Sequence, residues 1–422
     1  MSALEYARLQ FSLTASLHFT FVMVTLGLVL LVAVMQTRFV TTGDPVYGRM
    51  ARFWGQLYAI NYAVGIATGL VMEFELGLNW SGLSRLTGDV FGAPLALETL
   101  IAFVLESTLL GMWIFGWGRL GKRLHLALIW GVAATALLSA FWVLVSNSFL
   151  QHPVGYAIDA NGTARLTSFG ALLGNSALWM ALVHAVSATV LTGGVLMAGI
   201  SAWRLRRRRP LAAPDHELFR RSLRLGIRTG LVGTFLTIGF GYAQFGPIDE
   251  NQPMKLARGE EALAHQAEMV QRWGPGDYLV SEHVRTALDS MIGVANLLFL
   301  VLFIAQVLTF RDTLVRRRWA RPMSWLLTAL IPVPMLTGIL GWFVREEGRQ
   351  PWAVYGLLRT ADAVSPMSAD ALRWSTFGFS VVVAGLVLVD WWLLARAAAR
   401  KPGGEFGQQD EEIRIQQQEV TV

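Results

Sequence analysis

The chain has 422 residues, of which 54% are hydrophobic and 15% are charged, and it contains no cysteine. Soluble domains carry roughly 25% charged residues, so this composition excludes an ordinary soluble fold and indicates an integral membrane protein. Without cysteine the chain has no disulfide and no thiolate metal ligand, so a metal would be held by His, Met or carboxylate side chains. The net charge of +6 is interpreted as a topology signal rather than as a nucleic-acid-binding surface.

Nine apolar runs are long enough to cross a bilayer, which takes about 20 mostly apolar residues. The predicted spans are residues 11–36, 54–76, 94–117, 124–146, 177–203, 225–246, 289–310, 323–345 and 375–398. The first run has no small-residue cleavage site after a basic start, so it is predicted to be a span and not a cleaved signal. We therefore expect an all-α membrane protein with about nine transmembrane helices.

Basic residues gather in every second connection between these spans. They are Arg38, Arg49 and Arg52; Arg119, Lys122 and Arg123; Arg204, Arg206–Arg209, Arg220, Arg221 and Arg224; Arg311, Arg316–Arg318 and Arg321; and Arg396, Arg400 and Lys401. Cytoplasmic connections carry an excess of Lys and Arg, so the N-terminus is predicted outside and the C-terminus in the cytoplasm. The expected organisation is six spans in 1–246, an outer loop at 247–288, three spans in 289–398 and a polar cytoplasmic tail at 399–422.

Several ionisable or thioether side chains occur within or at the ends of the spans, where a charge costs a few kcal/mol. The residues predicted to lie near the outer face are His18, Glu98, His184, Met291, Glu346 and Arg349. Glu106 follows Glu98 by eight residues, which would put it on a similar face about 12 Å deeper.

Each of these residues also has an ordinary structural explanation. A single membrane His hydrogen-bonds a carbonyl, a Met fills core space, and a Glu at a helix start is stabilised by the helix dipole. These explanations do not account for the shared depth of two His, one Met and several carboxylates. Since His and Met are the axial ligands of electron-transfer haems, the pattern favours a haem site.

Longer motifs resemble subunit I of the cytochrome bd quinol oxidases over most of the chain. These motifs are Arg8-Leu9-Gln10-Phe11 with His18, Trp54-Gly55, Ala67-Thr68-Gly69, Met72-Glu73-Phe74, Asn79-Trp80, GDVFGAPLALE at 88–98, Leu105-Glu106-Ser107-Thr108, Gln151-His152-Pro153, Gln252-Pro253-Met254-Lys255-Leu256-Ala257 and GRQPW at 348–352. GDVFGAPLALE together with GRQPW, in a chain with nine predicted spans, is a specific signature of that family.

The resemblance implies roles for the haem-side residues. His18, Glu98 and Glu346 match positions at the oxygen-reducing haem pair, and which of them serves which haem stays open. His184 and Met291 match the axial pair of a low-spin haem b. Arg349 and Trp342 match positions beside the haems.

The resemblance also implies a proton route and a quinol site. Glu106, Ser107 and Ser139 match a path for protons from the cytoplasm. Lys255 and Glu260 match quinol-binding positions in the loop at 247–288. The implied cofactors are two haems b and a third haem of d or b type, with quinol as substrate. The implied partners are cytochrome bd subunit II, small single-span subunits and oxygen, in a bacterial cytoplasmic membrane.

The stretch GWFVREEGRQPW at 341–352 places charges at the end of an apolar run. Arg349 is expected to offset the Glu346 carboxylate, Pro351 to end the helix, and Trp352 to anchor it at the membrane interface. Arg345 and Glu347 are predicted to form a solvated rim.

Two features depart from the family pattern. The loop at 247–288 is shorter than the usual quinol loop. Asp289 stands two residues before Met291, where the family commonly has Arg, and Arg285 is a candidate replacement one turn earlier.

The expected function is a terminal oxidase that oxidises quinol outside, takes protons from the cytoplasm and reduces oxygen to water, which generates a proton motive force without pumping. One alternative is a divergent haem protein that kept the oxygen site and has a weakened or lost quinol site. Another is a haem-free transporter, although the outer position of the ionisable residues disfavours the midplane site typical of transporters.

Overall fold

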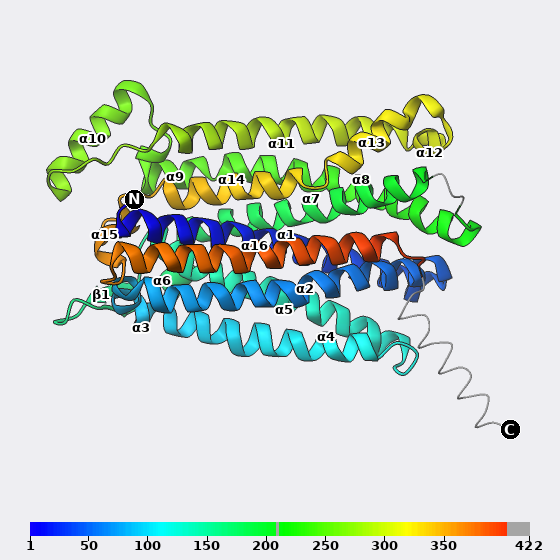
Figure 1. The fold of residues 1–422 in the computed structure, drawn as a ribbon, viewed down its shortest axis with the longest axis horizontal. Helices are drawn as coiled ribbons and strands as arrows, with labels where there is room; N and C mark the ends of the chain where they lie inside the picture. The colour runs from blue at the N-terminus through cyan, green and yellow to red at the C-terminus, as the bar shows by residue number, and fades with distance from the viewer. Residues whose placement is uncertain (208–210, 403–422) are drawn as a thin grey trace.

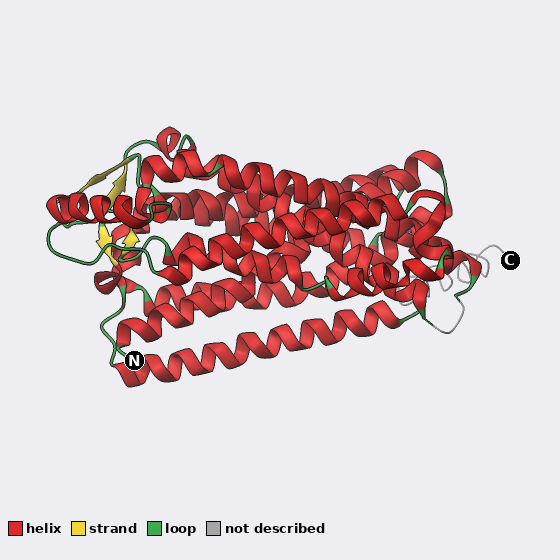
Figure 2. Ribbon diagram, turned by 90° about the horizontal axis from the view of Figure 1, so that it is seen from above, coloured by secondary structure: helices red, strands yellow, loops and turns green. Residues whose placement is uncertain are grey.

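The computed structural model describes residues 1–207 and 211–402, and these residues form a bundle of long helices (Figures 1 and 2). In this described part, nine helical runs are long and apolar enough to cross a membrane, which confirms the prediction. Their helices are α1 (Ala3–Thr42), α2 (Pro45–Asn79), α3 (Ser81–Leu97) with the π-helix η1 (Glu98–Val104) and α4 (Leu105–Phe115), α5 (Lys122–Gln151), α7 (Ser176–Arg206), α8 (Ala213–Ala243) with α9 (Phe245–Asn251), α11 (Glu282–Leu308), α13 (Arg321–Ala329) with α14 (Val333–Glu347), and α16 (Ala369–Ala399).

Shorter elements cover the two ends of the bundle. They are α6 (Phe169–Leu173), α10 (Gly259–Trp273), α12 (Thr313–Arg316), α15 (Thr360–Ala363), η2 (Pro253–Lys255), η3 (Phe310–Asp312) and η4 (Arg318–Ala320). Strand β1 (Tyr156–Ile158) pairs antiparallel with β2 (Ala164–Leu166), and β3 (Trp352–Val354) pairs with β4 (Leu358–Arg359). The end that carries these hairpins, α10 and the start of α1 is called the hairpin end, and the opposite end, with α12, is called the arginine-rich end (Figure 1).

Helix α1 runs through the middle of the bundle and packs against α2, α5, α7, α14 and α16. Small residues allow the closest of these approaches. A Cβ atom on Gly27 would lie 2.2 Å from the backbone oxygen of Thr189 on α7, and one on Gly194 would lie 2.3 Å from the backbone nitrogen of Gly230 on α8. Small residues at helix crossings are the usual means of tight packing in membranes, where no hydrophobic effect drives helices together.

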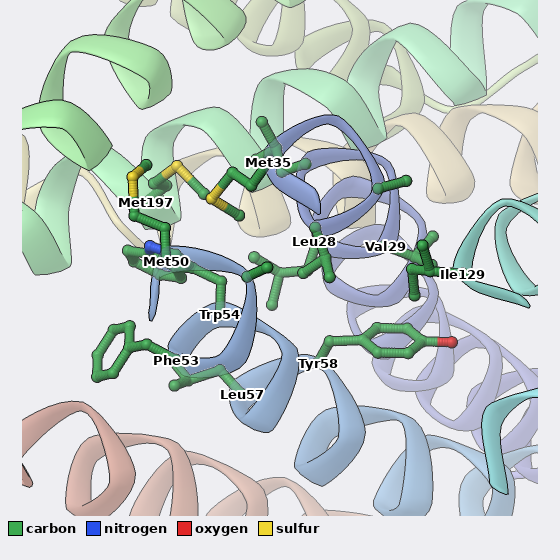
Figure 3. Packing of buried hydrophobic residues seen from close by; sticks show 14 of the residues in the cluster. Leu28, Val29, Met35, Met50, Phe53, Trp54, Leu57, Tyr58, Ile129 and Met197 are labelled. Carbon is green, nitrogen blue, oxygen red and sulfur yellow. The ribbon is translucent and has the colours of Figure 1, made fainter. Parts of the chain in front are cut away.

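A large apolar cluster fills the bundle toward its arginine-rich end. Figure 3 shows Leu28, Met35, Met50, Trp54 and Met197 of this cluster, which come from α1, α2 and α7. All five side chains are fully buried or nearly so. This cluster is called the dry core, and it fixes the relative positions of the helices that carry functional side chains nearer the hairpin end.

The helices extend beyond the predicted apolar runs because a helix satisfies its own backbone groups even where its side chains are polar. The first span was predicted at 11–36 and the helix covers Ala3–Thr42. The loop predicted at 247–288 contains α10, and α11 begins at Glu282. Most of the tail predicted at 399–422 lies outside the described residues, as do Arg208 and Arg209 of the basic run.

Candidate functional site

A cavity of about 780 Å³ lies among α1, α2, α5, α7, α11 and α14. A volume of several hundred Å³ is typical of ligand and cofactor sites. The predicted site residues that line it are His18, Glu98, Glu106, Ser139, His184, Lys255, Met291, Trp342, Glu346 and Arg349. Residues from eight separate segments of the chain therefore meet at one site.

The two cavity histidines are held by hydrogen bonds at Nδ1. His184 Nδ1 lies 2.9 Å from the backbone oxygen of Thr237, which can only accept. His18 Nδ1 lies 2.8 Å from the Thr68 hydroxyl, and that hydroxyl donates its own proton to the oxygen of Gly65. Both rings therefore carry their proton on Nδ1, which leaves Nε2 with a free lone pair for a metal.

Two glycines leave space for the Met291 thioether and the His184 ring. A Cβ atom on Gly341 would lie 3.1 Å from Met291 Sδ, and one on Gly241 would lie 3.1 Å from His184 Cε1. Any larger residue at either position would displace these side chains. The sulfur of Met291 and the ring of His184 are thus accommodated by neighbouring helices at the wall of one cavity.

Glu346 lies at the centre of a buried polar cluster at the hairpin end. Its Oε2 accepts from Arg349 Nη2 at 2.7 Å, and its Oε1 accepts from Asn147 at 2.9 Å and from Gln151 at 3.4 Å. The side chains of Arg349 and Glu346 are only 6% and 7% exposed. The expected pairing of these two residues is therefore present, and Glu346 is also held by two amides of helix α5.

Two further cations face this cluster. Arg345 donates to Asn147 Oδ1, and Lys255 Nζ donates to Gln151 Oε1 at 2.8 Å and to the Arg345 backbone oxygen at 3.0 Å. Burial lowers the pKa of the Lys255 amine well below its usual value, and the charges of Arg345 and Arg349 lower it further. Arg345 and Arg349 thus bring positive charge to the cavity wall, and the lowered pKa of Lys255 favours its neutral amine.

The prediction of a solvated rim at Arg345 and Glu347 is wrong. Both residues line the cavity, and Glu347 forms an ion pair with Arg8 of α1 and accepts from Ser12. The error arises because α1 extends past its apolar run and brings a cation to a place where sequence periodicity predicts only water.

Glu98 lies in the middle of its helical run and not near the start, which corrects the prediction. The sequence GDVFGAP at 88–94 contains helix-weakening residues, yet the helix begins at Ser81 and continues through Pro94. The π-helix η1 begins at Glu98 and separates it from Glu106. Such π segments occur frequently at functional sites because they shift the facing of the residues that follow.

The polar partners of the two glutamates also differ from the expectation. Ser139 donates to Glu98 Oε1 at 2.7 Å, while Glu106 Oε1 accepts from the Tyr58 hydroxyl at 3.3 Å. Ser107 shares a 3.1 Å hydrogen bond with Tyr62. Ser139 therefore bonds Glu98 and not Glu106, whose hydrogen-bond partner is Tyr58.

Some predicted residues lie apart from the cavity wall. Glu260 is exposed in the first turn of α10 and is not among the lining residues. Neither Asp289 nor Arg285 lines the cavity: Asp289 pairs with Arg258 at 2.7 Å, and Arg285 bonds the backbone oxygen of Ala257. The residues predicted to bind quinol are thus less concentrated at the cavity than the residues predicted to bind haem.

Sequence reasoning missed Asn147, Tyr58 and Tyr62 as site residues, and it noted Gln151 only as part of a family motif. A search for ionisable groups passes over amides, and Tyr is ordinary in membrane spans. Asn147 could have been found as an amide inside the apolar run FWVLVSNSFL, because polar side chains within spans are commonly functional.

The residues at the cavity fit a haem. Buried N–H groups of Arg345 (Nη2), Arg349 (Nη1) and Trp342 (Nε1) have no hydrogen-bond partner, so the wall offers donors to an anionic group. Over the described ranges, no three His, Asp or Glu side chains gather as in a bare metal site. An iron here would therefore take one or two ligands from the protein, which is the situation of haem iron with axial His or Met.

Comparisons with known proteins agree with this reading. The chain matches the family described as cytochrome bd terminal oxidase subunit I over residues 6–275 and 280–402. It is 37% identical to the cytochrome bd ubiquinol oxidase subunit 1 of Bacillus subtilis (strain 168), covering 92% of each chain. It is 30% identical to the cytochrome bd-II ubiquinol oxidase subunit 1 of Escherichia coli (strain K12), covering 96% of this chain and 98% of that one.

A solved structure of a bd oxidase from Geobacillus thermodenitrificans has the same fold, with a TM-score of 0.84 and 24% identity over 95% of this chain and 99% of the other. The resemblance stated from the motifs is therefore confirmed. The chain belongs to the cytochrome bd terminal oxidase subunit I family, and it is a multi-pass bacterial membrane protein and an oxidoreductase subunit of the respiratory chain.

Proposed function

We propose that this chain is the subunit of a quinol:oxygen oxidoreductase that oxidises a membrane quinol, reduces oxygen to water and generates a proton motive force without pumping. The observation that carries this proposal is the cavity in which the His, Met, carboxylate and cation side chains meet. A haem-free transporter does not account for two histidines that both keep Nε2 free. The family match also points away from it.

The proposed cofactors are two haems b and a third haem of d or b type. When bound, these haems supply the one-electron redox chemistry and the oxygen binding. His184 and Met291 are the residues that would hold the low-spin haem b, and His18 and Glu346 are those that would hold the other two. Glu346 accepts three hydrogen bonds and a carboxylate has about four acceptor sites, so one lone pair stays available.

Arg345 and Arg349 are proposed to stabilise negative charge at the site. Arg349 and Arg345 each keep a buried donor free beside Glu346, so they are proposed to bind the anionic edge of the haems. Such charge-assisted bonds are roughly twice as strong as neutral ones. Trp342, which stacks on Phe19 with ring centroids 5.8 Å apart, is proposed to pack beside the same group.

Proton movements on opposite sides of the membrane are the proposed source of the proton motive force. The arginine-rich end is proposed to be cytoplasmic because connections rich in Lys and Arg face the cytoplasm, and the tail predicted at 399–422 is proposed to be cytoplasmic as well. Glu106, with Ser107, Ser139 and Glu98, is the proposed route by which protons reach the oxygen site from there. Protons of the quinol are released at the hairpin end, so turnover separates charge.

The segment 247–288 is the proposed quinol-binding region, in the outer part between the spans of 1–246 and those of 289–398. Lys255 offers a buried amine to a quinol oxygen at the cavity edge. The second candidate is a member of the family with a weakened quinol site, and the exposure of Glu260 away from the cavity favours it. Oxygen uptake driven by a quinol, compared with uptake driven by an artificial electron donor, distinguishes the two.

The proposed partners are subunit II and small single-span subunits. Apolar side chains stay exposed on α2, α4 and α16, including Phe74, Phe115 and Trp392, and these faces are available to lipid or to a partner. We expect the active protein to purify as a membrane heterodimer. Full activity of this chain as a monomer in mild detergent would contradict that expectation.

The decisive experiment is Glu106→Gln in the assembled oxidase. Glutamine keeps the size and the hydrogen bonding of glutamate but cannot ionise, so the variant is expected to keep its haem spectrum and accept electrons from quinol while consuming oxygen slowly. An oxygen electrode, with haem content measured on the same sample, gives the answer. Normal uptake per haem would reject the relay, and slow uptake with lost haem would indicate a structural role.

A further inference from the structure

Two tyrosines of α2 face the two consecutive polar residues of α4 that belong to the proposed proton path. The Tyr58 hydroxyl donates to Glu106 Oε1 at 3.3 Å, and the Tyr62 hydroxyl shares a 3.1 Å hydrogen bond with Ser107 Oγ. The tyrosines are four residues apart on one helix, so they lie on the same face, and their ring centroids are 5.8 Å apart.

The two hydroxyls differ in their surroundings. Tyr58 is fully buried in the dry core, and Figure 3 shows its hydroxyl pointing away from Phe53 and Trp54. Tyr62 lines the cavity together with Glu98, Glu106 and Ser139. Because α2 runs from the arginine-rich end to the hairpin end, Tyr62 is the one nearer the cluster around Glu346 (Figure 1).

We propose that these tyrosines are part of the proton path: Tyr58 positions the Glu106 carboxyl, and the hydroxyl of Tyr62 passes protons from the Glu106–Ser107 step into the cavity. This inference rests on the proposed role of Glu106. In the Tyr62 step, one O–H bond forms as the incoming proton binds the phenol oxygen, and another breaks as the hydroxyl's own proton leaves toward the cavity. Tyr62 ends unchanged and no electron moves.

A phenol suits this position because a hydroxyl can accept and donate in the same hydrogen-bond chain, whereas a phenylalanine of the same shape can do neither. A buried hydroxyl without a hydrogen-bond partner would cost free energy, since a polar group taken from water must be paired. Both hydroxyls are paired with residues of the path and not with the backbone of their own helix.

The test uses Tyr62→Phe in the complete oxidase, with Tyr47→Phe on the same helix but outside the site as the matched control. Oxygen uptake per haem is measured with a reduced quinol analogue in H2O and in D2O. Tyr62→Phe is expected to slow uptake about tenfold, less than the roughly 100-fold of a lost acid–base group because a water molecule can stand in for the hydroxyl. Its ratio of rates in H2O and D2O is expected to exceed that of the wild type, and the control is expected to match the wild type.

Normal uptake or an unchanged isotope ratio in Tyr62→Phe would overturn the Tyr62 step. If this variant loses haem, Ser107→Ala, which removes the other partner of the same hydrogen bond without changing the aromatic wall, replaces it and is decided by the same criteria. Glu106→Gln is measured beside them. If oxygen uptake is slow in Glu106→Gln but normal in Tyr62→Phe, only the tyrosine path is rejected. If oxygen uptake is normal in Glu106→Gln, the Glu106 relay on which the tyrosine path rests is rejected.

The positioning role of Tyr58 has a separate spectroscopic readout. A carboxylic C=O band that disappears from the reduced-minus-oxidised infrared spectrum in Glu106→Gln belongs to Glu106. Tyr58→Phe removes the hydrogen bond to that group, so the band is expected to shift to higher frequency while haem content stays normal. A band that does not move in Tyr58→Phe would overturn the positioning role.

Discussion

The hairpin end and the arginine-rich end each contain an ion pair, and the two pairs differ in how far they are exposed. At the hairpin end the Glu346–Arg349 pair is almost fully buried, with both side chains less than 10% exposed. At the arginine-rich end Arg220 and Asp312 also form an ion pair, but the arginine is 27% exposed and reaches water. The buried pair faces the cavity, whereas the pair at the arginine-rich end lies outside it, so the burial of Glu346 and Arg349 is tied to the site.

The two ends also differ in how their interiors are packed. The dry core holds large apolar side chains and helix crossings that are too tight for a Cβ atom, whereas the interior nearer the hairpin end holds a largely apolar cavity with charged side chains in its wall. Buried ion pairs add little net stability because desolvation offsets their attraction. The tight crossings therefore hold the bundle together, and the cavity depends on them.

The strongest way to test that dependence is Gly27→Ala. The new Cβ atom would meet the backbone oxygen of Thr189, which cannot move unless α1 and α7 separate. We expect a destabilisation of about 3 kcal/mol or more, at the upper end of overpacking costs, with loss of most haem-containing protein from the membrane fraction. Gly111→Ala, whose Cβ would meet nothing within 4 Å, is the matched control and should accumulate normally.

The second test breaks the buried charge pair. Arg349→Leu leaves the Glu346 carboxylate buried without its ionic partner, and removing one member of such a pair costs about 3 kcal/mol or more. Arg165→Leu, at the same end but with a side chain 53% exposed, is expected to cost less than about 1 kcal/mol. Thermal unfolding of the two purified variants gives the comparison, and equal melting temperatures would show that burial of the pair does not matter.

The third test separates ligation from packing. Met291→Leu conserves volume and is expected to cost less than about 1.5 kcal/mol, yet to remove the low-spin haem b signal while the high-spin signals remain. Met335→Leu, a buried Met of the dry core, is expected to leave the whole visible spectrum unchanged. A low-spin signal that persists in Met291→Leu would exclude Met291 as ligand.

The smallest expected effect is a pH dependence at Lys255. Since burial lowers the pKa of the folded amine, the unfolded chain binds a proton that the folded protein does not bind between the lowered pKa and the usual value of about 10.4. Stability therefore rises with pH through that window. Lys255→Met is expected to flatten this rise in melting temperature, while Lys122→Met, at the arginine-rich end, should keep it. Parallel curves for Lys255→Met and the wild type would contradict the prediction.

The nine spans could be predicted from the sequence because each is an apolar run that must cross the same thickness of hydrocarbon, a property local to the run. The donors His18, His184, Met291 and Glu346 could also be found one by one, because polar groups within or at the ends of apolar runs stand out. Their family motifs, GDVFGAPLALE and GRQPW, are likewise local in sequence.

Only the tertiary structure decided which of these side chains meet, and with which partners. Glu98 is in the middle of its helix because the residues before Pro94 stay helical against their local preferences, and tertiary packing routinely overrides such preferences. Glu347 pairs with Arg8, and Glu106 with Tyr58, across helices far apart in the chain. Those contacts depend on the distance between the helices and on the rotation of each helix about its axis. Glycines and side-chain shapes on both helices set these two quantities, so neither segment alone predicts them.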